Sequence, residues 1–312
     1  MKASKLPLKN LRSASKRFMT QQCRQPMAAD NLQKLETFLH PLCEKGIALA
    51  FSGGVDSSLL LAVLVTMRRE REFPLLVLNA RSTLQSSRDL EEVRAAASEY
   101  GITVQFVECD VLALPEVRGN SLLRCYHCKK LLFRSMMEKA AEVGICTLLE
   151  GSHADDLKAY RPGRKALAEL GVVSPLEVLG FSKAEIRSMA RALDVKTAAR
   201  PSSPCLATRF DYGTLLTEEN LRMAGEGERF LRTLLSAECD LRLRLHGKLG
   251  RIEVNEKYFS FVLEKRTEIL RELKKLGIEK VSLDIAGFSS GSFDRKSEGA
   301  TTVGTGEPEP FS

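Results

Sequence analysis

The feature that most constrains this chain is the stretch from residue 47 to 61, which reads IALAFSGGVDSSLLL. Five apolar residues of strand length lead into the loop SGGVDS at 52–57, and an apolar run of helical length follows. A strand, a glycine turn and a helix make the phosphate-binding unit of many α/β proteins, because a helix N-terminus carries unpaired N–H groups and a partial positive charge. Two consecutive glycines also let the backbone approach a ligand closely. The stretch therefore predicts an anion-binding loop after a buried strand.

Asp56 indicates which anion this loop is expected to bind. No Gly-Lys-Ser/Thr follows the glycines, so the loop is not of the Walker type. A carboxylate beside a bound polyphosphate is repulsive unless Mg²⁺ lies between them, so Asp56 predicts a metal-bridged nucleotide. We therefore expect ATP and Mg²⁺ to be held by Ser52, Gly53, Gly54, Asp56 and Ser57. A tight strand-to-helix turn without a ligand is the alternative.

Strands and helices alternate on both sides of this loop, which predicts a parallel sheet. Apolar runs of strand length occur at 74–79, 103–107 and 146–150, and helical patterns occupy 89–100 and 124–143. In such a sheet ligands bind at the C-terminal ends of the strands, so Asn79, Arg81 and Gly151 are candidate walls of the nucleotide site. Ordinary β-to-α loops are the alternative for each. The expected fold class is therefore α/β, with a Rossmann-like parallel sheet.

The composition changes after residue 205, which predicts a second domain. A charged helix at 217–235 is followed by strands that alternate apolar and polar residues at 240–246 and 249–254, a helix at 256–276 and a strand at 278–285. Strand, strand, helix and strand make a small α+β domain. We predict four parts: a basic disordered tail at 1–28, the α/β domain at 29–205, the α+β domain at 206–290 and a disordered tail at 291–312.

The net charge of +7 is concentrated near the beginning of the sequence. Seven of the 47 basic residues precede the first acidic residue, Asp30, which leaves 40 basic residues to balance 40 acidic ones. The remainder is neutral, which argues against a nucleic-acid partner. The basic segment has the composition of a transit peptide, and a disordered extension is the interpretation that we favour. No apolar run approaches the roughly 20 residues that span a bilayer, so we expect no membrane association.

The cysteines do not have the pattern of a disulfide framework. Eight cysteines in a chain of 312 residues that uses ATP favour a reducing cytoplasm. We expect five of them to be core or surface thiols: Cys23, Cys43, Cys109, Cys146 and Cys239.

The other three cysteines are candidates for chemistry. Cys125 and Cys128 lie one turn apart at the start of a predicted helix, where the helix N-terminus favours thiolates. The pair is compatible with half of a zinc site, half of an iron–sulfur site, a redox dithiol or chance. Cys205 lies in a proline-edged loop of the kind that borders an active site. Three thiolates would leave one iron of a four-iron cluster open for an exchangeable sulfide.

Several motifs together point to one family. The SGGVDS loop resembles that of the PP-loop ATP pyrophosphatase superfamily. The further motifs are RCYHCKKLLF from Arg124, EGSHADDLKAYRPG from Glu150, PCLATRFDYGT from Pro204, RLRLH from Arg242, and LDIAGFSSG near the end. Together they resemble the LarE family of ATP-dependent sulfur transferases, which make the nickel-pincer cofactor of lactate racemase. The resemblance runs from about residue 32 to 291.

The resemblance implies a specific reaction and specific roles. ATP would adenylate a carboxylate of a pyridinium dicarboxylate mononucleotide, and sulfur would then replace oxygen to give a thiocarboxylate. Lys129 would neutralise phosphate charge, and Arg209, Arg242 and Arg244 would bind substrate phosphate, a task suited to planar guanidinium groups. Arginines that alternate with leucines are also typical of a solvated strand face. Glu228 matches an acidic family position and would contribute to a metal site.

The source of sulfur separates two kinds of family member. Some relatives have one cysteine that gives up its own sulfur and becomes dehydroalanine. The set of Cys125, Cys128 and Cys205 predicts instead an oxygen-sensitive [4Fe–4S] cluster, an external sulfur donor and several turnovers per protein. We also expect a homo-oligomer.

Two other classes of protein share parts of this pattern. A tRNA-thiolating enzyme also combines a PP-loop with a CxxC pair and a distant cysteine, but it would need a basic RNA-binding face. A nucleotide sensor without catalysis would keep the phosphate loop and would have no use for three matched thiols. Pyrophosphate exchange that depends on the pyridinium nucleotide distinguishes the three classes.

Overall fold

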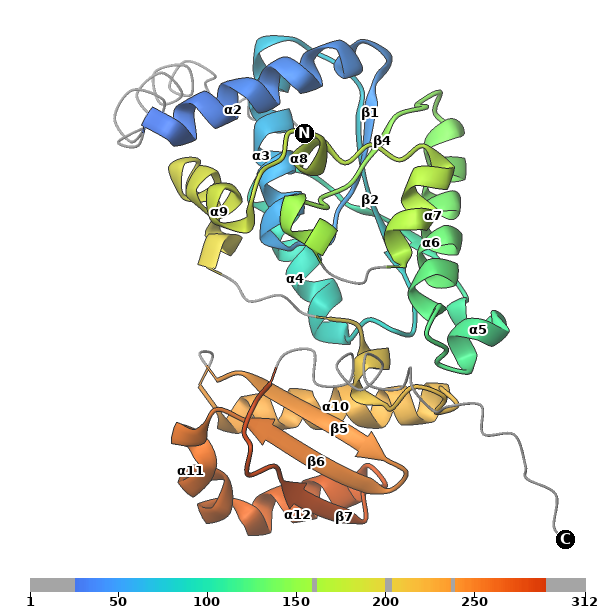
Figure 1. The fold of residues 1–312 in the computed structure, drawn as a ribbon, viewed down its shortest axis with the longest axis vertical. Coiled ribbons are helices and arrows are strands. Elements are labelled where there is room, and N and C mark those ends of the chain that lie inside the picture. Colours follow the sequence, from blue (N-terminus) through green and yellow to red (C-terminus); the bar gives the residue numbers. More distant parts are fainter. Residues whose placement is uncertain (1–25, 159–161, 200–203, 237–238, 290–312) are drawn as a thin grey trace, which may run out of the picture. The chain divides into compact units, whose positions relative to one another are not determined.

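The computed structural model describes residues 26–158, 162–199, 204–236 and 239–289. Within them the chain forms two compact units, each assembled from three stretches (Figure 1). Unit 1 comprises Met1–Ser82, Asp89–Cys109 and Cys125–Ser203, and unit 2 comprises Thr83–Arg88, Asp110–Arg124 and Pro204–Ser312. The tails predicted at 1–28 and 291–312 lie outside the described residues, except that the helix α2 (Pro26–Leu39), the first in the described part of the chain, begins at Pro26.

A four-stranded parallel sheet forms the centre of unit 1. Its strands follow the order β3-β2-β1-β4 and are β1 (Ile47–Ala50), β2 (Leu75–Arg81), β3 (Gln105–Glu108) and β4 (Leu148–Leu149). All three pairings are parallel, with Leu49 opposite Val77 in β2 and opposite Leu149 in β4. This arrangement confirms the predicted α/β fold class, and it places the phosphate loop at the C-terminal end of a central strand.

Helices cover both faces of this sheet. In Figure 1, α3 (Val55–Glu70) and α9 (Lys183–Ala192) lie on one side, and α6 (Arg124–Ala141) and α7 (Gly163–Leu170) lie on the other. From Leu59 to Leu64 every residue of α3 is buried, because the helix packs against β1 as well as α2 and α9. Helix α9 begins with a capping box, in which Ser182 and Glu185 bind each other's backbone N–H groups.

The sequence did not predict the short helices of unit 1. They include α7, the single-turn helix α8 (Pro175–Val178) and the 3-10 turn η3 (Ala154–Lys158). Each is too short to show a helical period. Helix α4 (Ser87–Ser98) matches the predicted helix at 89–100 closely.

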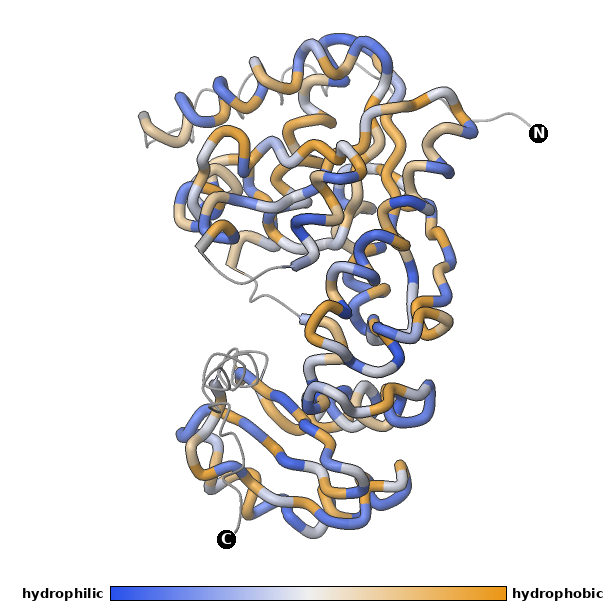
Figure 2. Tube along the Cα trace, turned by 45° about the vertical axis from the view of Figure 1, so that its right-hand side comes forward, coloured by the Kyte–Doolittle hydropathy of each residue, from blue (hydrophilic) through white to orange (hydrophobic). Residues whose placement is uncertain are grey.

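Unit 2 contains a three-stranded mixed sheet. Strands β5 (Leu241–His246) and β6 (Leu249–Val254) are antiparallel, and β7 (Lys280–Leu283) pairs with β6 in parallel. Hydrophilic and hydrophobic residues alternate along these strands (Figure 2). Helix α10 (Glu218–Leu234) packs against β5, and the predicted helix at 256–276 is interrupted at Lys265, between α11 (Phe259–Glu264) and α12 (Arg266–Lys275).

Two segments from the first half of the chain belong to unit 2, although they precede the predicted boundary at residue 205. The Leu206 N–H donates to the Leu84 carbonyl at 2.9 Å, and the Leu216 N–H donates to the Arg118 carbonyl at 2.7 Å. Asn120 is fully buried with a φ of 49°, and its side-chain amide donates to the Asp211 carbonyl at 2.9 Å. These segments fix the stretch that follows Cys205.

None of the described helices combines the length and the apolar composition that a membrane crossing requires.

Candidate active site

The phosphate loop is closed by its own serines. The Ser57 hydroxyl accepts a hydrogen bond from the Ser52 N–H and donates to the Gly54 carbonyl, both at 3.2 Å. The two hydroxyls lie 3.1 Å apart. Gly53 has a φ of 71°, and a Cβ there would approach the Val93 backbone to 3.1 Å, so only glycine fits. The loop therefore keeps the shape that brings backbone N–H groups to an anion.

Gly151 is the second glycine whose position the structure explains. A Cβ at this position would lie 3.0 Å from the Asp56 Cβ and 3.1 Å from the Ser57 nitrogen, so the loop after β4 contacts the start of α3. The buried Glu150 carboxylate holds this loop, because it accepts hydrogen bonds from the Ser152 N–H at 2.8 Å, the Ser152 hydroxyl at 2.9 Å and the Ser174 hydroxyl. Gly151 is thus brought to the predicted nucleotide loop.

Asn79 and Arg81, the other two residues predicted to line the nucleotide site, differ in burial. Asn79 is buried, and its amide donates to the Phe51 carbonyl at 2.7 Å, which joins the ends of β1 and β2 next to the loop. Arg81 is exposed and pairs with Glu108 on β3 at 3.1 Å. Asn79 therefore shapes the strand ends, whereas the nucleotide role of Arg81 stays a prediction.

Lys183 is the residue of this site that the sequence analysis missed. Its ammonium group lies 2.7 Å and 2.6 Å from the two carboxylate oxygens of Asp56. Lys183 opens α9 and its own N–H donates to Asp155 at 2.8 Å. No local signal in the sequence connects the start of this helix with a loop 127 positions earlier. The Asp56 carboxylate is a hard oxygen donor of the type that Mg²⁺ requires, so the loop fits the predicted metal.

The CxxC pair lies in the first turn of α6 in unit 1. Cys125 and Cys128 are both half-buried, and Tyr126 between them donates its hydroxyl to Glu169 of α7 at 2.8 Å. The Lys129 ammonium lies 5.8 Å from the centre of the Phe133 ring. Its predicted role toward phosphate stays a prediction.

Cys205 lies in unit 2, where Arg209 fixes its loop. Cys205 is half-buried and caps the 3-10 turn η5 (Leu206–Arg209). The Arg209 guanidinium donates to the Pro204 carbonyl at 3.0 Å and to the Thr208 hydroxyl at 2.8 Å. It also forms a two-pronged ion pair with Glu228 of α10, with both hydrogen bonds at 2.8 Å.

These contacts bear on the roles predicted for Arg209 toward phosphate and for Glu228 toward a metal. Arg209 is 3% exposed and Glu228 7% exposed, and one oxygen of Glu228 also accepts the Leu243 N–H at 2.9 Å. A carboxylate that is engaged in this way is first of all a structural partner of Arg209. The geometry favours a positioning role for both residues, and their predicted roles toward phosphate and metal stay predictions.

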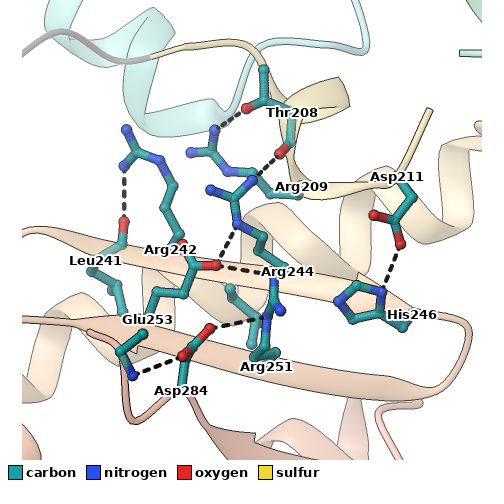
Figure 3. A network of polar contacts seen from close by, with 12 residues as sticks. Thr208, Arg209, Asp211, Leu241, Arg242, Arg244, His246, Arg251, Glu253 and Asp284 are labelled. Atoms are coloured by element: carbon teal, nitrogen blue, oxygen red, sulfur yellow. Dashed lines mark hydrogen bonds and ion pairs between the residues drawn. The ribbon is translucent and has the colours of Figure 1, made fainter. Parts of the chain in front are cut away.

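The two predicted arginines of β5 have different surroundings (Figure 3). Arg244 is buried and donates to Glu253 at 2.6 Å and to the Thr208 carbonyl at 2.7 Å, so it joins β6 to the turn after Cys205. Arg251 binds the same Glu253 at 3.2 Å and Asp284 at 3.6 Å. The reading of this strand face as fully solvated is therefore wrong for Arg244, because β6 supplies a carboxylate beside it.

Arg242 has no carboxylate within ion-pair distance among the residues that the structure describes. Its guanidinium donates to the Leu241 carbonyl at 2.9 Å and lies 5.1 Å from the centre of the Phe288 ring. Burial, followed by the nearby charge of Arg209, lowers the pKa of Arg242 to about 10. A half-buried cation of this kind is suited to an anionic ligand.

The remaining described cysteines agree with the expected core and surface roles. Cys43, Cys109 and Cys239 are buried, and burial raises the pKa of each thiol, while Cys146 is exposed. Cys23 lies outside the described residues. In the described part of the chain, no group of three or more His, Cys, Asp or Glu side chains is arranged to hold a metal ion. The geometry therefore lends no support to the predicted [4Fe–4S] cluster.

Comparison with known proteins identifies a domain family and several relatives of this chain. A family model described as a PP-loop domain matches residues 27–202. A relative from Lactiplantibacillus plantarum named pyridinium-3,5-bisthiocarboxylic acid mononucleotide synthase is 31% identical over 245 residues, which cover 78% of this chain and 87% of the relative.

Two relatives without an assigned activity also match. An uncharacterized protein of Synechocystis sp. is 32% identical over 271 residues, covering 86% of this chain and 98% of the relative. An uncharacterized protein of Methanocaldococcus jannaschii is 28% identical over 246 residues, covering 79% of this chain and 92% of the relative. The phosphate loop on a parallel sheet, the family match and the synthase relative agree, and the chain belongs to the LarE family of PP-loop ATP-dependent sulfur transferases.

Proposed function

We propose that this protein adenylates a carboxylate of a pyridinium dicarboxylate mononucleotide with ATP and converts it to a thiocarboxylate for a nickel-pincer cofactor. The observation that carries the proposal is the phosphate loop, in which the Asp56 carboxylate lies in the first turn of α3 and no Walker lysine follows the glycines. The synthase named above supplies the substrate class, because its match covers most of both chains.

The reaction has two steps. A carboxylate oxygen of the substrate attacks the α-phosphorus of ATP, the bond to the β-phosphate breaks, and pyrophosphate leaves with the electron pair. Hydrosulfide then attacks the acyl carbon, and AMP leaves, so that one oxygen is exchanged for sulfur without a redox change. Backbone N–H groups of the closed loop around Ser52 and Ser57 hold the pyrophosphate portion and stabilise its growing charge. Asp56 would hold the Mg²⁺ that accompanies ATP.

Substrate binding is assigned to unit 2. Of the three predicted phosphate-binding arginines, Arg209 and Arg244 already pair with buried carboxylates, whereas Arg242 retains a desolvated positive charge. We therefore assign Arg242 as the principal contact with the phosphate of the mononucleotide.

We further propose that Cys125, Cys128 and Cys205 ligate a [4Fe–4S] cluster. The support is the sequence: a CxxC pair opening a helix, and a third cysteine in a fixed loop. When bound, the cluster would supply an exchangeable position for the hydrosulfide of an external sulfur donor. We also propose that the protein forms a homo-oligomer.

The adenylation step has a direct test. Isotope exchange between ATP and pyrophosphate should require the pyridinium dicarboxylate mononucleotide, and Asp56→Ala should abolish exchange while the circular dichroism spectrum is retained. A tRNA-thiolating enzyme would require tRNA for exchange, and a sensor would show none. Products of ADP and orthophosphate would overturn the proposal.

The cluster has a separate test. Protein purified without air should be brown and contain iron and acid-labile sulfide, and Cys205→Ala should lower both while pyrophosphate exchange continues. Cys146→Ala is the matched control, because Cys146 is exposed and is not a proposed ligand. Iron-free anaerobic protein whose mass falls by the elements of H₂S after one turnover would instead support the sacrificial cysteine.

A further inference from the structure

The ion pair between Lys183 and Asp56 occupies the position that the metal is expected to take. The ammonium contacts both carboxylate oxygens, at 2.7 Å and 2.6 Å, and the two side chains are 28% and 22% exposed. A carboxylate in this state cannot also bind Mg²⁺, because the cation would then lie against the ammonium group. In the described structure, the metal ligand of the phosphate loop is therefore neutralised by the protein itself.

The position of Lys183 is not explained by the stability of its helix. Lys183 is the first residue of α9, where the positive end of the helix dipole disfavours a cation. The backbone around it is nevertheless well fixed, since its N–H donates to Asp155, the Ala154 N–H donates to the Phe181 carbonyl, and Ser182 and Glu185 form the capping box. A fixed backbone with a long flexible stem allows the ammonium to move while α9 stays in place.

We propose that Lys183 is a phosphate-binding residue of the nucleotide site and works by exchange of partners. Without nucleotide it neutralises Asp56. When ATP arrives with Mg²⁺, Asp56 becomes available to the metal, and the Lys183 ammonium transfers to the oxygens of the polyphosphate. Each charged group has a partner of opposite sign in both states: the ammonium pairs first with the Asp56 carboxylate and then with the polyphosphate, and the carboxylate pairs first with the ammonium and then with Mg²⁺. This inference deepens the proposed function and rests on it for the identity of the nucleotide.

This exchange of partners by Lys183 has a consequence for the affinities of the metal and the nucleotide. Lys183 competes with free Mg²⁺ for Asp56, so the metal should bind weakly in the absence of nucleotide. The same residue should strengthen the binding of the metal–nucleotide complex. A lysine that only held α9 against α3 would neither weaken the binding of free Mg²⁺ nor strengthen the binding of the metal–nucleotide complex.

The test measures metal and nucleotide affinity separately, without catalysis. Binding of Mn²⁺ alone is followed by electron paramagnetic resonance, and binding of MgATP by calorimetry. Lys183→Met should bind Mn²⁺ more tightly than the wild type and MgATP roughly ten- to a hundredfold more weakly, the scale of a lost charged hydrogen bond. Lys196→Met is the matched control, because Lys196 pairs with Glu99 on the surface of the same unit at 3.1 Å and should change neither affinity.

The outcomes separate the inference from its alternatives. Two results would overturn the exchange of partners and leave the ion pair with a structural role. One is an unchanged affinity of Lys183→Met for MgATP. The other is a weaker binding of both Mn²⁺ and MgATP together with a lower melting temperature. If Lys183→Met does not fold, Lys183→Gln, which keeps a hydrogen-bond donor but no charge, takes its place and should show the same opposite changes. Wild-type protein that binds MgATP but catalyses no exchange of pyrophosphate would overturn the proposed reaction and leave the role of Lys183 intact.

Discussion

Arg209 and Glu228 show how single residues hold the loop of Cys205. The ion pair is buried on both sides, and the same guanidinium reaches the carbonyl of Pro204. An ion pair of this kind is costly to break from one side, because the remaining charge is left buried without its partner. The two residues therefore act as one structural unit.

Replacement of Glu228 by alanine should lower the free energy of unfolding by about 3–5 kcal/mol, since Arg209 would stay buried and charged. The double variant Arg209→Met with Glu228→Leu should lose less, because it removes both charges. Urea unfolding followed by circular dichroism measures both. A Glu228→Ala protein of unchanged stability would favour the metal role predicted for Glu228 from the sequence.

Single residues also mark the limit of what the sequence predicts. The loop residues Ser52 to Ser57 were predicted because their spacing is local and their chemistry is specific. Lys183 was missed because its partner Asp56 is 127 positions away. The burial of Arg244 was missed for a related reason, since alternation shows which side of a strand a residue faces but not which neighbouring strand carries a carboxylate.

Strand β5 is the element of unit 2 to which we assign substrate binding. Arg242 and Arg244 lie two positions apart on it, yet only Arg244 has a carboxylate partner in the described structure. The alternating pattern predicted the strand and its register toward the core correctly, because Leu241, Leu243 and Leu245 are all buried. It could not show that one arginine is neutralised and the other is not.

Arg242→Ala should raise KM for the mononucleotide much more than KM for ATP, with kcat little changed, because uniform binding of one ligand is lost. Steady-state kinetics with each substrate varied in turn gives both constants. Arg244→Ala is a poor control, because it removes the buried guanidinium that joins Glu253 to the Thr208 carbonyl. Arg251→Ala on β6 tests whether the loss of any neighbouring arginine has the same effect. Equal changes in both KM values would remove Arg242 from substrate binding.

The titration of Arg242 gives a second prediction. Its pKa of about 10 lies below that of an arginine in an unfolded chain. The charged form of Arg242 therefore lowers the free energy of unfolding at neutral pH. This loss of stability disappears as the pH rises from about 10 toward the pKa of arginine in the unfolded chain. A bound phosphate should offset the loss. Inorganic phosphate is therefore expected to raise the melting temperature at pH 7 in the wild type and not in Arg242→Ala, as measured by differential scanning calorimetry.

The molecule as a whole is not two successive domains. The chain alternates between the units, and the segments 83–88 and 110–124 belong to unit 2 together with 204–289. Sequence composition predicted a change near residue 205 but not these early segments, because they are short and belong to unit 2 through contacts with residues 206–216 that are distant in the sequence.

A fragment made of residues 204–289 should therefore fold incompletely. Amide hydrogen exchange in the stretch 205–216 should be much faster in this fragment than in the full chain, since the carbonyls of Leu84 and Arg118 and the Asn120 side chain are missing. The strands β5 and β6 provide the internal reference. Equal protection of this stretch in fragment and full chain would show that the early segments are dispensable.

Strand β5 is also an outer strand of its sheet, with β6 on one side only. Outer strands can recruit a strand from another molecule through their unsatisfied backbone groups. Here the Leu243 N–H is already taken by Glu228, which is itself held by Arg209. A second copy could extend the sheet at this point only by opening an ion pair in the interior. Pairing of a second copy with β5 at Leu243 would therefore require this ion pair to open, so we expect any homo-oligomer to form through other surfaces.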